Sequence, residues 1–207
     1  AWTASVATAQ GPAYVVSCAA VFAVDPATAA VQRTIPVGGT VARLATSADG
    51  SRVYASIAGA GAVAVIDAAT GVVTTTLAVG PAPSGLAVAP DGATLYVSGA
   101  GGAVHVVDVA AGVVTATVAT GTGDAADLAL TADGTTLYAA SGIVAAIDTA
   151  TGTVITSFGT GATSVEVTPD GATVYVVAIT DLFGGGLFVY DASAGYGLVG
   201  SLGLGMP

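Results

Sequence analysis

The feature that most constrains the fold is a short motif that recurs at nearly fixed spacing along the chain. Each copy has an Asp-Gly pair and, five residues after the aspartate, a tyrosine. The four copies begin at Ser47, Ala89, Thr131 and Thr168, and their aspartates, Asp49, Asp91, Asp133 and Asp170, lie 42, 42 and 37 residues apart. A period of this length indicates supersecondary units that stack on one another.

A second motif alternates with the first and occurs five times. Apolar residues lead into an aspartate, and small residues follow it. The aspartates are Asp25, Asp67, Asp108, Asp148 and Asp191, with spacings of 42, 41, 40 and 43 residues. We therefore expect a single domain over residues 1–207 that contains five repeats. Their approximate bounds are 1–38, 39–80, 81–121, 122–161 and 162–207.

The repeat from Pro83 to Gly121 shows how one unit is built. Short apolar runs predict strands over 84–89, 94–98, 103–107 and 113–119. Asp91-Gly92 marks a tight hairpin turn between the first two strands. Each sheet is apolar on both faces, so copies must bury those faces against one another around an axis. We predict an all-β fold, specifically a β-propeller of five four-stranded antiparallel blades.

The composition excludes several classes of partner. Hydrophobic residues make up 54% of the chain and charged residues 8%, and the net charge is −10. Three arginines and no lysine cannot neutralise a row of phosphates, which argues against nucleic acid and anionic membrane surfaces. Gly, Asp or Pro interrupts every long apolar stretch, so we expect no membrane insertion by a spanning helix.

The segments LYVSG and VYVVA, V-I-D-x-x-T-G-x-V, and P-x-G-x-A-x-x-P-D-G together resemble the YVTN family of β-propeller repeats. The resemblance covers essentially the whole chain and implies a propeller of the kind known from bacterial and archaeal surface proteins. Two features depart from the family. Its strand asparagine is replaced by Ser98 and Ala139, and its rings commonly have more than five blades. A closed ring of five blades is our first expectation, and a fragment of a larger ring is the alternative.

The residue types that usually perform catalysis are scarce. The repeated aspartates stand at turns, where a carboxylate accepts hydrogen bonds from nearby backbone amides, so we interpret them as structural. His105 is the single histidine and aligns with apolar positions in the other repeats, which predicts a packed, hydrogen-bonded side chain. Cys18 is the single cysteine and is expected to be a buried apolar residue. We expect no catalytic, cofactor or metal site.

Positions that break the repeat are the candidate binding residues. Charged residues occur in the first predicted strand of three repeats, at Arg43, Asp127 and Glu166. They are interpreted either as inter-blade ion pairs or as groups that hold a polar ligand. The pair of acids that most resembles a cation site is Asp124 and Asp127. The last repeat has an insertion, Ile179–Gly186, predicted as a mobile loop whose candidate contact residues are Asp181, Leu182 and Phe183. Strand order places the insertion on one face with Asp124, Asp127, Arg43 and the neighbourhood of Cys18.

These observations favour a non-enzymatic scaffold. We expect an extracellular or cell-surface protein, secreted with its signal peptide removed, that binds other proteins. The expected partners are copies of itself or another surface or filament protein. A propeller that binds a small ligand or carbohydrate is the first alternative, and an enzyme resembling lactonase or lyase propellers is the second. Such enzymes need several His, Arg or Glu residues together, whereas this chain has one His, three Arg and one Glu.

Overall fold

The computed structural model describes residues 3–5, 12–17, 20–121, 123, 127–181 and 184–205. Their regular structure is antiparallel β-sheet apart from two single-turn 3-10 helices, η1 (Ala58–Ala60) and η2 (Ala100–Gly102). The predicted all-β class is therefore confirmed. Within these residues, no helix has the length and apolar character needed to cross a membrane.

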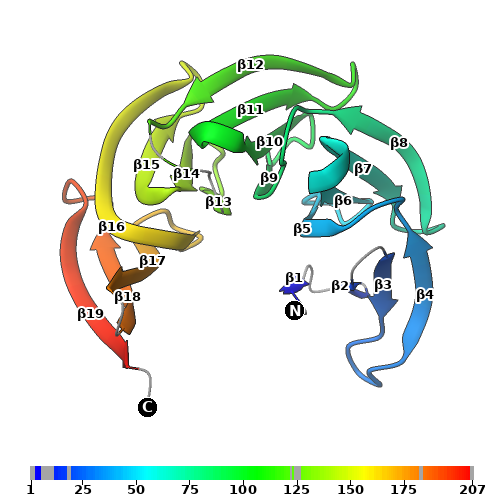
Figure 1. Cartoon of the computed structure of the whole chain (residues 1–207), viewed down its shortest axis with the longest axis horizontal. Helices are drawn as coiled ribbons and strands as arrows, with labels where there is room; N and C mark the ends of the chain where they lie inside the picture. The colour runs from blue at the N-terminus through cyan, green and yellow to red at the C-terminus, as the bar shows by residue number, and fades with distance from the viewer. Residues whose placement is uncertain are drawn as a thin grey trace. The chain divides into compact units, whose positions relative to one another are not determined.

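The described strands form three four-stranded sheets and one seven-stranded sheet, each with its strands in sequence order (Figure 1). The first sheet contains β1 (Thr3–Ser5), β2 (Ala13–Ser17), β3 (Ala20–Val24) and β4 (Val31–Pro36). The second contains β5 (Val41–Thr46), β6 (Arg52–Ile57), β7 (Ala62–Asp67) and β8 (Val72–Ala78). The third contains β9 (Leu86–Val88), β10 (Thr94–Gly99), β11 (Ala103–Asp108) and β12 (Val113–Ala119). The predicted four-stranded meanders are thus confirmed for these three sheets.

The last two repeats differ from the prediction, because they form one sheet of seven strands. It contains β13 (Asp127–Leu130), β14 (Thr136–Ala140), β15 (Gly142–Asp148), β16 (Thr153–Val167), β17 (Thr173–Asp181), β18 (Gly184–Asp191) and β19 (Gly197–Gly205). The first half of β16 pairs with β15 and its second half with β17. One strand therefore serves both repeats, and the expectation of five separate four-stranded sheets is wrong at this point. The linking segment has no proline, so its backbone N–H groups can continue the pairing.

The chain divides into two compact units. The first unit comprises Ala1–Gly99 and His105–Thr115, and the second comprises Ala100–Val104 and Ala116–Pro207. Adjacent sheets within the first unit share apolar cores. One core joins Tyr14 to Val53, and another joins Tyr54 to Leu95. In the second unit, a core surrounds Tyr138. Burial of the sheet faces against neighbouring strands, which the repeat predicted, is therefore observed inside each unit.

The two aspartate motifs form turns of the expected kind. In the hairpin after β5, the N–H of Ser51 donates to Asp49 Oδ1 at 3.0 Å. In the turn after β7, the N–H of Thr70 donates to Asp67 Oδ1 at 2.7 Å. Corresponding bonds recur at the turns of the other repeats. The structural interpretation of these aspartates is confirmed, since each carboxylate completes its own turn.

A buried serine on β6 links two sheets of the first unit. Ser56 is fully buried; its hydroxyl accepts a hydrogen bond from the Arg43 N–H at 2.9 Å and lies 2.8 Å from the Ser84 carbonyl oxygen, to which it donates. Arg43 belongs to β5, in the same sheet, and Ser84 lies just before β9 of the next. One small hydroxyl therefore satisfies backbone groups on both sides of the contact.

The change Ser56→Ala is expected to lower the free energy of unfolding by about 1–3 kcal/mol, because the backbone groups of two half-buried residues each lose a hydrogen bond. Urea unfolding followed by circular dichroism measures the difference. Ser201→Ala, at an exposed position on β19, is the matched control and should change stability by less than about 0.5 kcal/mol. Equal, small losses in both variants would show that the Ser56 hydroxyl does not stabilise the contact.

Candidate functional site

The structure brings two of the predicted binding residues together in the second unit. Asp127 begins β13, and its Oδ2 accepts hydrogen bonds from the Ser164 hydroxyl and, at 3.3 Å, from the Val165 N–H. Ser164 and Glu166 alternate along β16, so their side chains leave the same side of the strand. The Asp127 carboxylate therefore joins β13 to β16 beside Glu166.

The environment of Glu166 disfavours its charge. Burial, followed by the negative charge of Asp127, raises the pKa of Glu166 from its usual 4.5. A good part of the Glu166 side chain is nevertheless exposed to solvent, so water screens much of the effect. Asp127 and Glu166 therefore form a weakly destabilising pair of acids, in which Asp127 accepts a hydrogen bond from the backbone of Val165.

Glu166→Gln should raise the melting temperature slightly at pH 7, by about 1–2 °C. The folded-state pKa of Glu166 is above its unfolded value of 4.5, so stability falls as pH rises through that interval. The gain from the substitution should therefore disappear below about pH 4. Differential scanning calorimetry at several pH values measures the difference in melting temperature between the variant and the unmodified protein.

Asp148→Asn is the comparison variant and should change the melting temperature in the opposite direction. Hydrogen bonds from the Thr151 N–H and then its hydroxyl hold the pKa of Asp148 below its usual 3.8. The stability that this carboxylate contributes is present above pH 3.8 and is lost as pH falls through the lowered folded-state value. The substitution should thus lower the melting temperature at pH 7. A gain for Asp148→Asn, or a loss for Glu166→Gln, would contradict these assignments.

Two other predicted binding residues lie on other strands. Arg43 lies on β5 in the first unit, and Asp181 ends β17, where its backbone is paired with Gly184. Four further predictions fall outside the described residues: Cys18, Asp124, Leu182 and Phe183.

The insertion in the last repeat is not the loop that we predicted. β17 continues to Asp181 and β18 starts at Gly184, so the extra residues lengthen a hairpin. The Val-Val-Ala-Ile-Thr run before Asp181 is rich in β-branched residues, whose high β propensity explains the extension. Gly185 permits the close pairing, because a Cβ there would lie 2.9 Å from the Ala178 carbonyl oxygen. The prediction of a mobile loop is therefore wrong for the described part of this segment.

His105 is packed as the sequence predicts. Its ring lies against Gly80 and Gly99, where an added Cβ would approach Nε2 to 3.3 and 2.9 Å. Burial lowers the pKa of His105, which favours the neutral imidazole at neutral pH.

Two pockets lie at equivalent places in the repeat, each between the hairpins of successive repeats. The first turn pocket, of about 240 Å³, is in the first unit, and the second, of about 380 Å³, is in the second unit. Residues of the first include Ser47, Asp49, Ser51, Tyr54, Pro90 and Asp91. Their counterparts in the second are Thr131, Asp133, Thr135, Tyr138, Pro169 and Asp170. The hairpin motif therefore builds a pocket as well as a turn.

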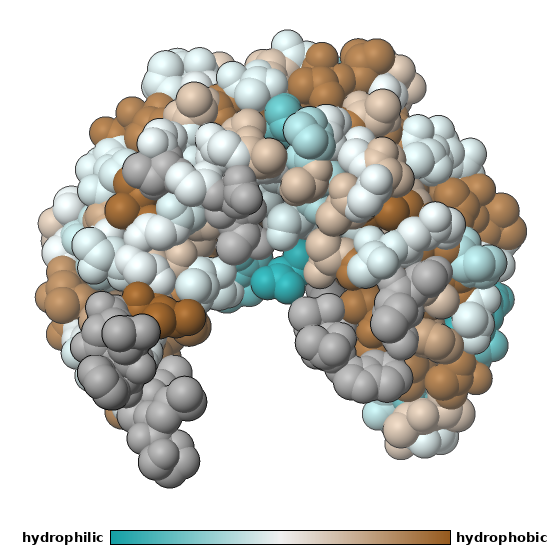
Figure 2. All heavy atoms as spheres, in the orientation of Figure 1, coloured by the Kyte–Doolittle hydropathy of each residue, from teal (hydrophilic) through white to brown (hydrophobic). Residues whose placement is uncertain are grey.

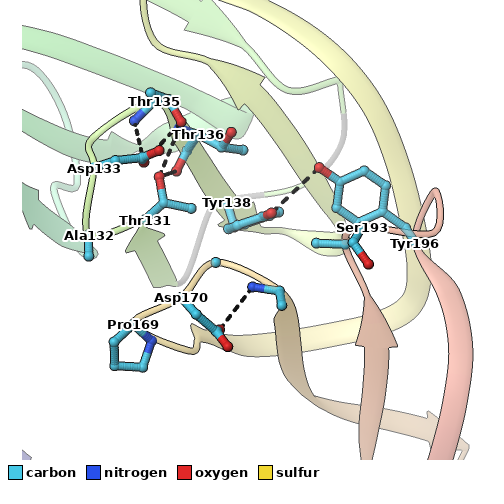
Figure 3. Close-up of a pocket in the computed structure, with 13 residues that line it drawn as sticks. Thr131, Ala132, Asp133, Thr135, Thr136, Tyr138, Pro169, Asp170, Ser193 and Tyr196 are labelled. Atoms are coloured by element: carbon cyan, nitrogen blue, oxygen red, sulfur yellow. Dashed lines mark hydrogen bonds between the residues drawn. The ribbon is translucent and has the colours of Figure 1, made fainter.

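Aromatic side chains form one wall of the second turn pocket (Figure 3). The hydroxyls of Tyr138 and Tyr196 lie 3.5 Å apart. Behind them, the ring of Phe158 stacks on Tyr196 with 4.7 Å between the ring centroids. Burial, followed by the hydrogen bond with Tyr196, raises the pKa of Tyr138, so its phenol is neutral across the physiological range.

Tyr196 reaches this position through an unusual turn. The other described turns after the third strand of a repeat place Ala29, Gly71, Gly112 or Gly152 four residues after the aspartate, with positive φ. The last turn has one extra residue, and Tyr196 itself has φ 63°. A bulky residue in this conformation costs about 1–3 kcal/mol. The extra residue is visible in the sequence as D-A-S-A-G-Y-G, but its effect on the tyrosine is not.

The pKa values of three turn-pocket carboxylates, those of Asp49, Asp133 and Asp170, are lowered. Hydrogen bonds from the Ser47 hydroxyl and from Ser51 lower the pKa of Asp49 to about 2. The pKa values of Asp133 and Asp170 are also lowered, mainly by hydrogen bonds from the threonine hydroxyls two residues before them. Hydrogen bonds from the Thr135 N–H and hydroxyl reach Oδ1 of Asp133, and those from the Thr168 hydroxyl and the Ala172 N–H reach Oδ1 of Asp170.

Sequence reasoning identified these aspartates only as turn residues. Each motif by itself explains its own hydrogen bonds, and the pocket requires two motifs about 40 residues apart to meet. The sequence feature that could have indicated the pockets is the recurrence of aspartate, hydroxyl and tyrosine residues at fixed offsets. Over the described part of the chain, no three His, Cys, Asp or Glu side chains gather where they could bind a metal ion.

Comparisons with known proteins inform the fold. No family model matches the chain, and no curated protein matches its sequence. Among solved structures, a chain of hydrazine synthase from Kuenenia stuttgartiensis is similar, with a TM-score of 0.84 and 22% sequence identity. The match covers 94% of this chain and 63% of the hydrazine synthase chain, which is therefore considerably longer than the part matched. At this identity the likeness concerns the fold alone.

Proposed function

We propose that this chain is an extracellular or cell-surface β-propeller of the YVTN type that acts as a non-enzymatic scaffold for protein interaction, including association with copies of itself. The main support is the character of its sheet edges. β8 and β12 are end strands of their sheets, and neither contains a charged residue. Natural edge strands commonly have lysine, proline or a bulge that prevents pairing with another chain. β8 and β12 contain neither lysine nor proline, and the β7–β8 pairing shifts register between Val65 and Ile66.

The side chains on these strands also favour contact with a protein. Val72 on β8 is 56% exposed and Val113 on β12 is 51% exposed. In the second unit, Leu202 on β19, another end strand, is 61% exposed. Figure 2 shows brown, apolar atoms on the visible surface of both units. An edge that combines open backbone groups with β-branched side chains suits the addition of a strand from a second chain.

Light scattering after size-exclusion chromatography, over a range of concentrations, tests self-association. We expect particles larger than one chain, with a mass that rises with concentration. The double variant Val72→Lys/Val113→Lys puts two cations on the edges and should return the particle to the mass of one chain. Ala27→Lys/Ala60→Lys is the control, since it makes the same charge change at exposed positions outside the edge strands.

Two results would contradict the proposal. One is a single-chain mass at every concentration for the unmodified protein. The other is equal dissociation of both lysine variants, because a general change in net charge would then be the cause.

Five blades closing into one ring is our proposal for the architecture of the complete scaffold. An arc of a larger ring is the alternative, in keeping with the greater length of the hydrazine synthase chain. Class averages from electron microscopy separate the two: a closed ring of five spokes supports the proposal, and a ring or arc with more spokes supports the alternative.

A further inference from the structure

The turn pockets have a chemistry that recurs although their surroundings differ. In each, two aspartates from successive hairpins face a strand tyrosine, with serine or threonine hydroxyls between them. Both pockets also include a proline ring, Pro90 in the first and Pro169 in the second. The same set of groups therefore occurs at two places that share no residue.

A buried polar atom without a hydrogen-bond partner lines the first turn pocket. Tyr54 is 0% exposed, and its hydroxyl has no hydrogen-bond partner in the described part of the protein. Leaving a buried hydroxyl without a partner is costly, so such groups in proteins normally meet a ligand or water. At the equivalent place in the second pocket, the Tyr138 hydroxyl meets that of Tyr196.

The available hydrogen-bonding groups define the class of ligand. Carboxylate oxygens accept hydrogen bonds. The hydroxyls of Ser47, Ser51 and Thr135 donate to the turn carboxylates and can still accept, and a tyrosine hydroxyl can donate and accept. A ligand that satisfies them must present several donors and acceptors close together. The hydroxyl groups of a sugar ring do so, and the apolar face of the ring can contact proline or the side of Tyr196.

The charged residues of the pockets restrict the class of ligand further. Two aspartate side chains line each pocket, which disfavours an anionic ligand. Arg52 lines the first pocket, whereas Thr136 occupies its place in the second. A cationic ligand would be repelled by Arg52, so only a neutral ligand suits both pockets. The volumes, about 240 and 380 Å³, fit a small ligand.

We propose that the turn pockets bind a neutral, hydroxyl-rich ligand, a saccharide, in the space between the hairpins of successive repeats. The proposal does not depend on self-association, and either can fail without the other. It assigns to the repeated aspartates a binding role in addition to their turn hydrogen bonds.

Nuclear magnetic resonance of the labelled protein tests the proposal with glucose, galactose, mannose and N-acetylglucosamine as probes. We expect saturable shifts of backbone amide signals in two regions for at least one sugar. The regions are residues 47–54 with 90–92, and residues 131–138 with 169–172.

Asp133→Asn/Asp170→Asn should weaken binding in the second turn pocket about 10-fold or more, because a charged acceptor is lost on each side. Binding in the first pocket should be unchanged in this variant. Asp148→Asn is the matched control: it removes a turn carboxylate with the same kind of hydrogen bonds, but Asp148 lies outside the pocket. Its binding should equal that of the unmodified protein.

Tyr54→Phe tests the first turn pocket with little risk to folding, since it removes only the unpartnered hydroxyl. Sugar affinity there should fall about 10-fold, while the melting temperature stays the same or rises. Three results would overturn the proposal: no saturable shift with any sugar, sugar shifts outside both pockets, or methylammonium or phosphate producing the pocket shifts when sugars do not.

Discussion

Gly161→Ala is expected to lower the free energy of unfolding by about 2–5 kcal/mol, one of the two largest effects that we predict. Gly161 has φ +69°, and a Cβ at this position would overlap the carbonyl oxygen of Ile179 on β17. The residue lies in β16 where the strand changes partner from β15 to β17. Backbone atoms form the obstacle, so no side chain can move to relieve it.

The loss at Gly161 has two causes, backbone strain at positive φ and steric overlap of the added Cβ, and Gly142→Ala separates them. Gly142 lies on β15 in the same sheet and has φ +83°, but an added Cβ would meet nothing within 4 Å. Only backbone strain remains there, which costs about 1–2 kcal/mol. Urea unfolding of the two variants measures both values. Equal losses would show that β16 does not approach β17 as closely as the structure describes.

Leu95→Ala is expected to cost about 2–5 kcal/mol, the second of the largest effects. Leu95 on β10 is fully buried and belongs to the core that Tyr54 joins from β6. Truncation leaves a cavity between two sheets whose own hydrogen bonds remain intact, so the loss measures the packing of one repeat on the next. Chemical unfolding again provides the measurement.

Leu202→Ala is the control for this prediction. It makes the same chemical change on β19, where the side chain is 61% exposed, and should cost less than about 0.5 kcal/mol. Similar losses at the two positions would mean that the sheets of the first unit do not depend on a shared core.

Much of the local structure could be predicted from the sequence. In the third repeat, the strands predicted over 94–98, 103–107 and 113–119 correspond to β10, β11 and β12 within one residue at each end. The hydrogen bonds of the turn aspartates and the packing of His105 were also predicted correctly. These features depend on residues close in sequence, whose β propensity and turn chemistry act over a few bonds.

The errors concern the last two repeats. The sequence motif marks a boundary between them, yet β16 passes through it as one strand, because its pairing partners on both sides remain available. The predicted loop over 179–186 is mostly a hairpin for a similar reason, since the two segments can satisfy one another's backbone groups. Two of the candidate binding residues, Asp127 and Glu166, are brought together within the second unit.

The sequence by itself determined the all-β class, the repeated meander and the turn chemistry of this protein, because periodic apolar residues and Asp-Gly turns constrain the backbone locally. Only the tertiary structure decided that the last two repeats share a strand and that neighbouring hairpins enclose pockets around Tyr54 and Tyr138. Both depend on how segments about 40 residues apart pack together. That packing is governed by steric fit and by burial of tyrosine hydroxyls, which no single motif specifies.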